Sequence, residues 1–309
     1  MPALLAREEY IEQAYFFRTF RERLKEDLPT QEILQALQDE LLASTRLPMA
    51  VNHLRTELLH SGVIFTGMRQ LGHYFTSFQA FVMEQAEQEG SRFDHWLALE
   101  ILEREADYKS KESLASGLFV FQFESLARNR LGYDRGLDAI AGDPIYNEAW
   151  KIWIKRLRAL LGTVDFADLL YHRSELAAKN REKQAAQKAS IQQLSQPEES
   201  GNEAAEVNST TSRAPQGEEI LFSDAAGRIA KANHGKDPLY LFAALQRQLG
   251  YPAVPRPQRA LKLAQTHPEL EMRLSRLEQR LHLMEAEQAG KLDLKEFLMK
   301  PPSFGDDLA

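Results

Sequence analysis

Apolar residues recur at helical spacing through the first 190 residues of this 309-residue chain. In the stretch 30–42, for example, Ile33, Leu37 and Leu41 fall on one face of a helix. No run in this part alternates apolar and polar residues as a half-buried strand would. The sequence therefore predicts a mainly α-helical protein, with an all-helical N-terminal domain over residues 1–194.

The stretch 195–219 has a different composition from the helical part before it. It is built mainly from Ser, Glu, Asn, Pro and Gly, and its one large aliphatic residue is Val207. Within residues 191–219, 6 acidic residues stand against 1 basic residue. Such a segment buries too little apolar surface to offset the entropy lost on ordering. We therefore expect a disordered acidic linker over residues 195–219, which divides the chain into two parts.

The second part begins with a small, mostly helical basic module over residues 220–265. Seven Lys and Arg residues stand there against Asp224 and Asp237. The sequence Asp-Ala-Ala-Gly at 224–227 is typical of a tight turn, and short apolar stretches flank it. A β-hairpin at 220–230 and a purely helical module both stay open.

Two helices are marked by the same pattern, an Asp-Pro pair at the start and a glycine at the end. Asp143–Pro144 stand ahead of a helix that Gly162 ends, and Asp237–Pro238 stand ahead of a helix that Gly250 ends. Asp is a common N-cap residue, and proline fits the first turn because it needs no N–H partner there. We therefore predict that both aspartates cap helices.

Nothing in the composition indicates a membrane span. The densest apolar run, Gly117–Phe123, is far shorter than the roughly 20 residues that cross a bilayer as a helix. The N-terminus has neither the basic region nor the long apolar stretch of a secretory signal. We therefore expect a cytoplasmic protein.

The chain contains no cysteine, which excludes disulfide bonds, cysteine nucleophiles, and zinc or iron–sulfur sites bound through thiolates. It also lacks the nucleophile elbow of α/β-hydrolases, the Walker-type phosphate loop and the glycine fingerprint of dinucleotide-binding proteins. We therefore expect no cofactor, and no catalytic residue is assigned from a local motif.

Two stretches combine aromatic with basic residues, a composition also found at nucleic-acid and membrane surfaces. In each of them the apolar residues share one helical face, with basic residues beside or opposite it. We therefore interpret both faces as parts of the core. The first face comprises Tyr10, Phe16, Phe17, Phe20, Leu24 and Leu28, and the second comprises Trp150, Trp153, Ile154, Leu157, Leu160 and Leu161.

His53, Glu57 and His60 form a weak candidate for a metal site. Their spacing places all three on one face of a helix, and Glu57 with His60 makes the Glu-x-x-His pair of di-metal helical bundles. Such a bundle needs a second Glu-x-x-His pair, which the chain lacks. The three residues also point away from the apolar face of their helix, so the simpler interpretation places them in solvent.

The stretch 266–289 predicts an amphipathic or coiled-coil helix opened by a Thr-x-x-Glu capping box. Its apolar residues step by four and three, as the a and d positions of a coiled coil do. They are Leu270, Leu274, Leu277, Leu281 and Met284. In a parallel dimer Arg273 faces Glu278 of the second copy, and Arg280 faces Glu285. An antiparallel pair would bring like charges together, so the pattern favours a parallel homodimer.

These features favour a non-enzymatic helical interaction or scaffold protein that self-associates through residues 266–289, followed by a flexible tail over residues 290–309. The partner is a second copy of the chain, or another helical protein. Two alternatives stay open. One is an enzyme with a scattered active site in the N-terminal domain. The other is an adaptor that binds nucleic acid through the basic module, and the only support for it is the local positive charge of that module.

Overall fold

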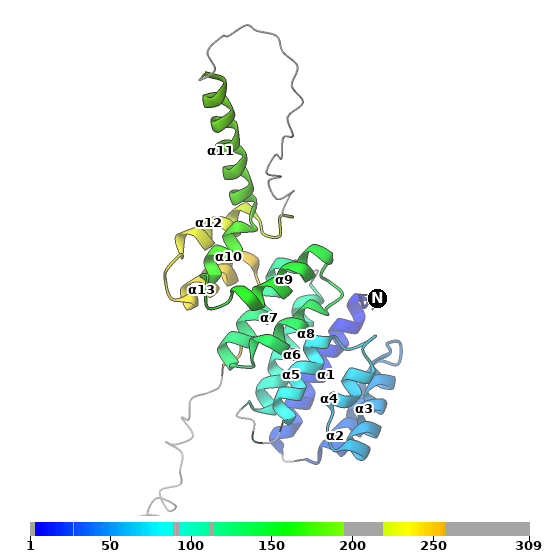
Figure 1. Ribbon diagram of the computed structural model, residues 1–309. Helices are drawn as coiled ribbons and strands as arrows, with labels where there is room; N and C mark the ends of the chain where they lie inside the picture. The colour runs from blue at the N-terminus through cyan, green and yellow to red at the C-terminus, as the bar shows by residue number, and fades with distance from the viewer. Residues whose placement is uncertain are drawn as a thin grey trace, which may run out of the picture. The chain divides into compact units, whose positions relative to one another are not determined.

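The structure is a computed structural model, and it describes residues 4–26, 28–88, 90, 93–111, 114–194 and 219–256. For residues 189–194 it describes the backbone alone. All of these residues lie within one compact unit, residues 1–257. Helices follow one another throughout the described part, which contains no β-strand, and this confirms the mainly α-helical prediction (Figure 1).

The helices of the described part pack mostly against their neighbours in the chain, and α1 also lies along the distant α6. Their bounds are α1 (Arg7–Arg23), the 3-10 helix η1 (Leu24–Glu26), α2 (Thr30–Glu40), α3 (Leu47–Ser61), α4 (Phe65–Gln70), α5 (Ser77–Glu87), α6 (His95–Lys109), α7 (Ala115–Asn129), α8 (Tyr133–Ala141), α9 (Glu148–Leu160), α10 (Phe166–His172), α11 (Glu175–Leu194), α12 (Asp224–Ala232) and α13 (Pro238–Leu249).

Helix α7 lies in the core. Every residue from Gly117 to Leu126 is buried, so the densest apolar run of the sequence forms a helix surrounded by protein. At Gly117 an added Cβ atom would lie 2.1 Å from the hydroxyl oxygen of Tyr108, which shows how closely α6 approaches α7. No helix in the described residues is long and apolar enough to cross a membrane.

The two aromatic-rich helices turn their apolar faces to the core, as predicted. Four of the six residues in each set are buried, and they are Tyr10, Phe16, Phe17 and Phe20 in α1, and Trp150, Trp153, Ile154 and Leu157 in α9. Leu28 was assigned to the first face but is exposed, because α1 ends before it and the helical periodicity no longer applies. Leu160 was assigned to the second face and is also exposed, at the last residue of α9.

Residues 219–256 share the hydrophobic core of the helices that precede them. The ring of Phe222 packs against both tryptophans of α9, with centroid distances of 5.2 Å to Trp150 and 5.4 Å to Trp153. The backbone N–H of Phe222 donates to the carbonyl of Arg173 over 3.1 Å, just before α11 begins. The described part of the basic module therefore does not fold away from the N-terminal helices.

Of the two alternatives left open for 220–230, the β-hairpin is wrong and the helical one holds, because Asp224–Ala232 form helix α12. Ser223 caps this helix, with its hydroxyl oxygen accepting a hydrogen bond from the N–H of Ala226. A serine cap followed by Asp and two alanines favours a helix, since alanine has the highest helix propensity. Phe222 makes an isolated parallel bridge with Ser174 instead of pairing within a hairpin.

The two Asp-Pro pairs behave differently. Asp237 caps α13, with its Oδ1 atom accepting from the N–H of Leu239 over 2.8 Å, as predicted. The prediction for Asp143 is wrong, because Asn147 caps α9 by accepting from the N–H of Trp150 over 3.0 Å. The connection before α9 offers two capping residues, and the one adjacent to the helix is used. The side chain of Asp143 is thereby left for another contact.

Candidate functional site

The structure places His53, Glu57 and His60 along α3. The Nε2 atom of His53 lies 2.8 Å from Oε1 of Gln70 in α4, and Glu57 packs against Gly67, where an added Cβ would lie 3.2 Å from the Cβ of Glu57. Among the described residues, no three His, Cys, Asp or Glu side chains are arranged to hold a metal ion. His53 and Glu57 therefore hold α4 against α3.

The predicted partner interface lies outside the described residues, together with residues 195–218 of the predicted linker and the tail 290–309. Its apolar seam comprises Leu270, Leu274, Leu277, Leu281 and Met284, and its charged flanks comprise Arg273, Glu278, Arg280 and Glu285. The structure describes the residues that precede this predicted interface, up to Arg256.

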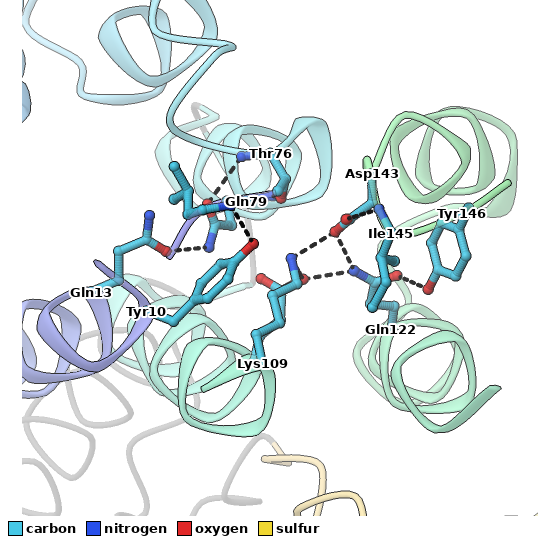
Figure 2. A network of polar contacts seen from close by, with 11 residues as sticks. Tyr10, Gln13, Thr76, Gln79, Lys109, Gln122, Asp143, Ile145 and Tyr146 are labelled. Carbon is cyan, nitrogen blue, oxygen red and sulfur yellow. Dashed lines mark hydrogen bonds and ion pairs between the residues drawn. The ribbon is translucent and has the colours of Figure 1, made fainter. Parts of the chain in front are cut away.

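A buried ion-pair network joins α6, α7 and the connection between α8 and α9. The Nζ atom of Lys109 lies 3.2 Å from Oε1 of Glu105 and 2.6 Å from Oδ2 of Asp143. Gln122 donates from Nε2 to Oε1 of Glu105 over 2.6 Å, and the hydroxyl of Tyr146 donates to Oε1 of Gln122 over 2.7 Å. All five residues are buried, and Figure 2 shows Gln122 between Asp143 and Tyr146.

Asp143 makes one contact within its own turn and a second one with the network. Its Oδ1 atom accepts a hydrogen bond from the N–H of Ile145 over 3.2 Å, while Oδ2 bonds Lys109. The carboxylate thus holds the connection before α9 and at the same time acts as the counter-ion of a lysine at the end of α6. An Asp that satisfies a nearby N–H in a turn is common, but the second contact depends on the tertiary fold.

Burial and neighbouring charges shift the pKa values of Lys109 and Glu105 in this network. Burial acts to lower the pKa of Lys109, but the charges of Asp143 and Glu105 outweigh it and raise that pKa above its ordinary value. Burial raises the pKa of Glu105, and the opposing charge of Lys109 does not fully cancel this. Among the described residues Oε2 of Glu105 has no hydrogen-bond partner. The raised pKa of Lys109 keeps its amine charged beside Asp143 and Glu105.

A second buried set of polar contacts joins α1 to α5. Gln79 donates from Nε2 to Oε1 of Gln13 over 3.1 Å. The side chain of Gln79 also accepts from the N–H of Thr76, and the hydroxyl of Thr76 accepts from the N–H of Gln79, which makes a capping box at the start of α5. Tyr10 lies between the two networks, with its ring centroid 6.0 Å from Nζ of Lys109 (Figure 2).

Two glutamates cap helices other than their own. Glu9 of α1 accepts from the N–H of Arg46 over 2.9 Å at the start of α3. Glu87 of α5 accepts from the N–H groups of Ile64 and Phe65, each over 2.7 Å, at the start of α4. A carboxylate at a helix N-terminus satisfies unpaired N–H groups and interacts favourably with the helix dipole. The polar groups of the domain thus mainly fix one helix on another.

The described chain ends in a segment with neither helix nor strand, residues 250–256, whose main anchor is Tyr251. This side chain is buried, and its hydroxyl donates to Oε2 of Glu124 in α7 over 2.7 Å. Burial raises the pKa of Tyr251, and the negative charge of Glu124 raises it further, so the hydroxyl keeps the proton that it donates. Arg128 forms an ion pair with the same carboxylate.

Backbone contacts fix the rest of this segment. Arg104 of α6 donates to the carbonyl of Ala253, and Nδ2 of Asn129 donates to the carbonyl of Pro255 over 3.3 Å. Val254, which lies between Ala253 and Pro255 in the sequence, is buried. The segment 250–256 is therefore docked on α6 and α7 of its own domain, through side chains and backbone together.

No family model, characterised protein or solved structure matches this chain. The function proposed below therefore rests on the chain's own residues and contacts.

The sequence analysis missed Glu105, Lys109 and Gln122. Glu105 and Lys109 lie on a helix rich in charged residues, which conceals that their face is buried. Gln122 had a signal, because it interrupts the densest apolar run of the chain. A polar side chain within a run that must be buried needs a buried partner, and that requirement predicts a network around α7.

Proposed function

We propose that this protein is a helical interaction protein that self-associates through residues 266–289 as a parallel pair of helices. The observation that supports this proposal is the anchoring of residues 250–256 on α6 and α7. Because that segment is fixed by side-chain and backbone contacts, the chain beyond it starts from a defined position on the domain. Between Arg256 and Thr266 the backbone reaches at most about 35 Å, so a paired helix would keep two domains close together.

The seam supplies most of the association free energy in this proposal. Five apolar residues along about three heptads bury a continuous stripe, which is near the lower limit for a stable coiled coil. The facing pairs Arg273–Glu278 and Arg280–Glu285 contribute about 0.2–1 kcal/mol each when exposed. Their main effect is to select the parallel orientation, because the antiparallel one opposes like charges.

The internal polar groups of the domain are consistent with a supporting role. Lys109 keeps its proton and is neutralised by Asp143 and Glu105, so its charge is used inside the protein. Glu9 and Glu87 are likewise used on backbone N–H groups of α3 and α4. A domain whose buried charges stabilise its own helices is suited to carrying an interaction segment.

The first experiment is the solution mass of the full chain by light scattering after size exclusion. We expect twice the 35.3 kDa of one chain. The full-length double variant L274E/L281E should have the mass of one chain, since two charges at facing a positions cannot be buried together. A wild-type mass of one chain, or a dimer that survives L274E/L281E, would refute the proposal.

Charge exchange tests whether the charged flanks face each other in the pair. The variant R273E/R280E carries glutamates on both flanks, and E278R/E285R carries arginines on both flanks, so each should self-associate more weakly than the wild type. Mixed in equal amounts, the two should form a heterodimer, because each flank then faces the opposite charge. Failure of the mixture to associate, with wild type dimeric, would show that these flanks do not face each other in the pair.

A further inference from the structure

A cavity of about 340 Å³ lies among α4, α5 and α8. Its volume falls in the range of small-molecule sites, and at about 30 Å³ per water it holds roughly ten water-sized groups. The side chains that define it are of two kinds. Met68, Phe75, Ala80 and Phe81 form apolar walls, and Arg69 and Arg135 bring positive charge to the same cavity.

The two arginines come from different helices and converge on one carboxylate. Arg69 of α4 donates from Nη2 to Oε2 of Glu84 over 2.9 Å, and Arg135 of α8 donates from its own Nη2 to the same oxygen. Phe65 helps to orient Arg69, whose guanidinium carbon lies 5.3 Å from the centroid of the phenyl ring. The structure thus shows that these two guanidinium groups can hold a carboxylate between them.

The arginines have hydrogen-bonding capacity beyond Glu84. A guanidinium group carries five N–H donors, and each arginine uses one nitrogen for Glu84. Their side chains are 58% and 60% exposed, so a second anion can approach them. Burial acts to raise the pKa of Glu84, but hydrogen bonds and charges from Arg135 and Arg69 lower it, so Glu84 stays ionised.

A second carboxylate, that of Asp138 of α8, also lines the cavity. Its Oδ2 atom lies 3.9 Å from Nη1 of Arg158. Arg158 in turn lies 2.7 Å from Oδ1 of Asp134. The cavity lining thus carries two arginines and two carboxylates, and of these carboxylates Glu84 bonds both arginines, while Asp138 lies nearer to Arg158.

We propose that this cavity binds a small molecule with an apolar body of about ten non-hydrogen atoms and a terminal carboxylate. The apolar body lies against Met68, Phe75 and Phe81, and the carboxylate bonds the free donors of the two arginines beside Glu84. Arginine suits this task because its planar fork matches a carboxylate. None of these residues belongs to the proposed self-association segment, so either proposal can fail without the other.

The test uses the full-length protein with ¹³C-methyl-labelled methionine and octanoate as the probe. Octanoate should shift the methyl signal of Met68, which lines the cavity, and leave that of Met49, which is 79% exposed on α3, unchanged. Octan-1-ol and octylamine have the same chain with a neutral and a positive head group. Both should bind at least about tenfold more weakly, the loss expected when a charge-assisted hydrogen bond is missing.

Variants then assign the head-group contacts. R69Q and R135Q should each weaken octanoate binding by roughly tenfold, and E84Q should tighten it because a competing carboxylate is removed. R228Q, which changes an exposed arginine on α12, is the matched control and should bind as wild type. Thermal unfolding of each variant verifies the fold. Equal binding of octanoate and octan-1-ol, no loss in R69Q/R135Q, or no shift of Met68 at the solubility limit would overturn the proposal.

Discussion

Lys109 and Asp143 stand 34 residues apart in the chain, yet Nζ and Oδ2 lie 2.6 Å apart, with side chains 2% and 1% exposed. Either charge alone would lose its hydration without compensation, which costs several kcal/mol. Glu105 and Gln122 complete the surroundings of the pair, so that α6, α7 and the connection before α9 meet at one point. The fold should therefore tolerate only matched changes at these positions.

Replacing Lys109 tests whether the stability of the fold depends on the buried ion-pair network. K109M leaves Asp143 and Glu105 buried without a counter-charge, so the free energy of unfolding should fall by about 3–5 kcal/mol. Urea denaturation at neutral pH measures it. Lys111 offers a matched control, because its ion pair with Asp107 is exposed and K111M should change stability by at most about 1 kcal/mol. Equal effects of K109M and K111M would show that the buried network does not determine stability.

The pH dependence of stability should carry a contribution from Glu105, whose pKa burial raises above its ordinary value of 4.5. An acid with a higher pKa in the folded chain holds its proton more tightly when folded. Its contribution to stability is therefore lost as the pH rises from about 4.5 through the folded-state pKa, and is constant above it. The variant E105Q cannot ionise and should lack this decline.

Urea denaturation of wild type and E105Q between about pH 4 and pH 8 tests that slope. The difference in free energy of unfolding should change in favour of E105Q as the pH rises through this window. E182Q, at an exposed position of α11, should follow the wild-type profile in parallel. A profile of E105Q parallel to the wild type would mean that Glu105 has the same pKa in the folded and in the unfolded chain.

The helices and their buried faces were largely predictable, because helical periodicity is a local property. Phe16 and Phe17 in α1, and Trp150 and Trp153 in α9, are buried as their spacing predicted. The start of α12 was not predicted for a local reason. The composition of residues 224–227 is typical of a turn, and the signal of a helix was Ser223, the serine that caps it.

The polar network was not predictable in the same way. Asp143 carries the sequence signature of a helix cap, and its real partner, Lys109, is fixed by how α6 packs on α7. The cavity has the same origin, because Arg69, Glu84 and Arg135 belong to three different helices. Such sites arise from packing, and spacing along one element does not reveal them.

Gly117 should be sensitive even to alanine. An added Cβ would lie 2.1 Å from the hydroxyl of Tyr108, which donates to the carbonyl of Leu249. The clash should exceed the gain in helix propensity, and G117A should lower the free energy of unfolding by about 1–3 kcal/mol. Adding Y108F removes the hydroxyl and should restore part of the loss in urea denaturation. No recovery in G117A/Y108F would place the strain elsewhere in the contact between α6 and α7.

We predict that Phe222 joins residues 219–256 to the N-terminal helices even when the two parts are expressed as separate polypeptides. Its ring packs on Trp150 and Trp153, so residues 219–256 belong to the same core as α9 although a long stretch of sequence separates them. Pieces comprising residues 1–206 and 207–309, expressed together with a tag on the first, should therefore purify as a complex. F222A should abolish the complex or weaken it strongly, since truncating a buried phenylalanine costs about 3–5 kcal/mol. Ile220 is 49% exposed two residues away, and I220A should leave the complex intact. Pieces that do not associate, or an F222A complex as stable as that of I220A, would show that the aromatic contact does not join the two parts.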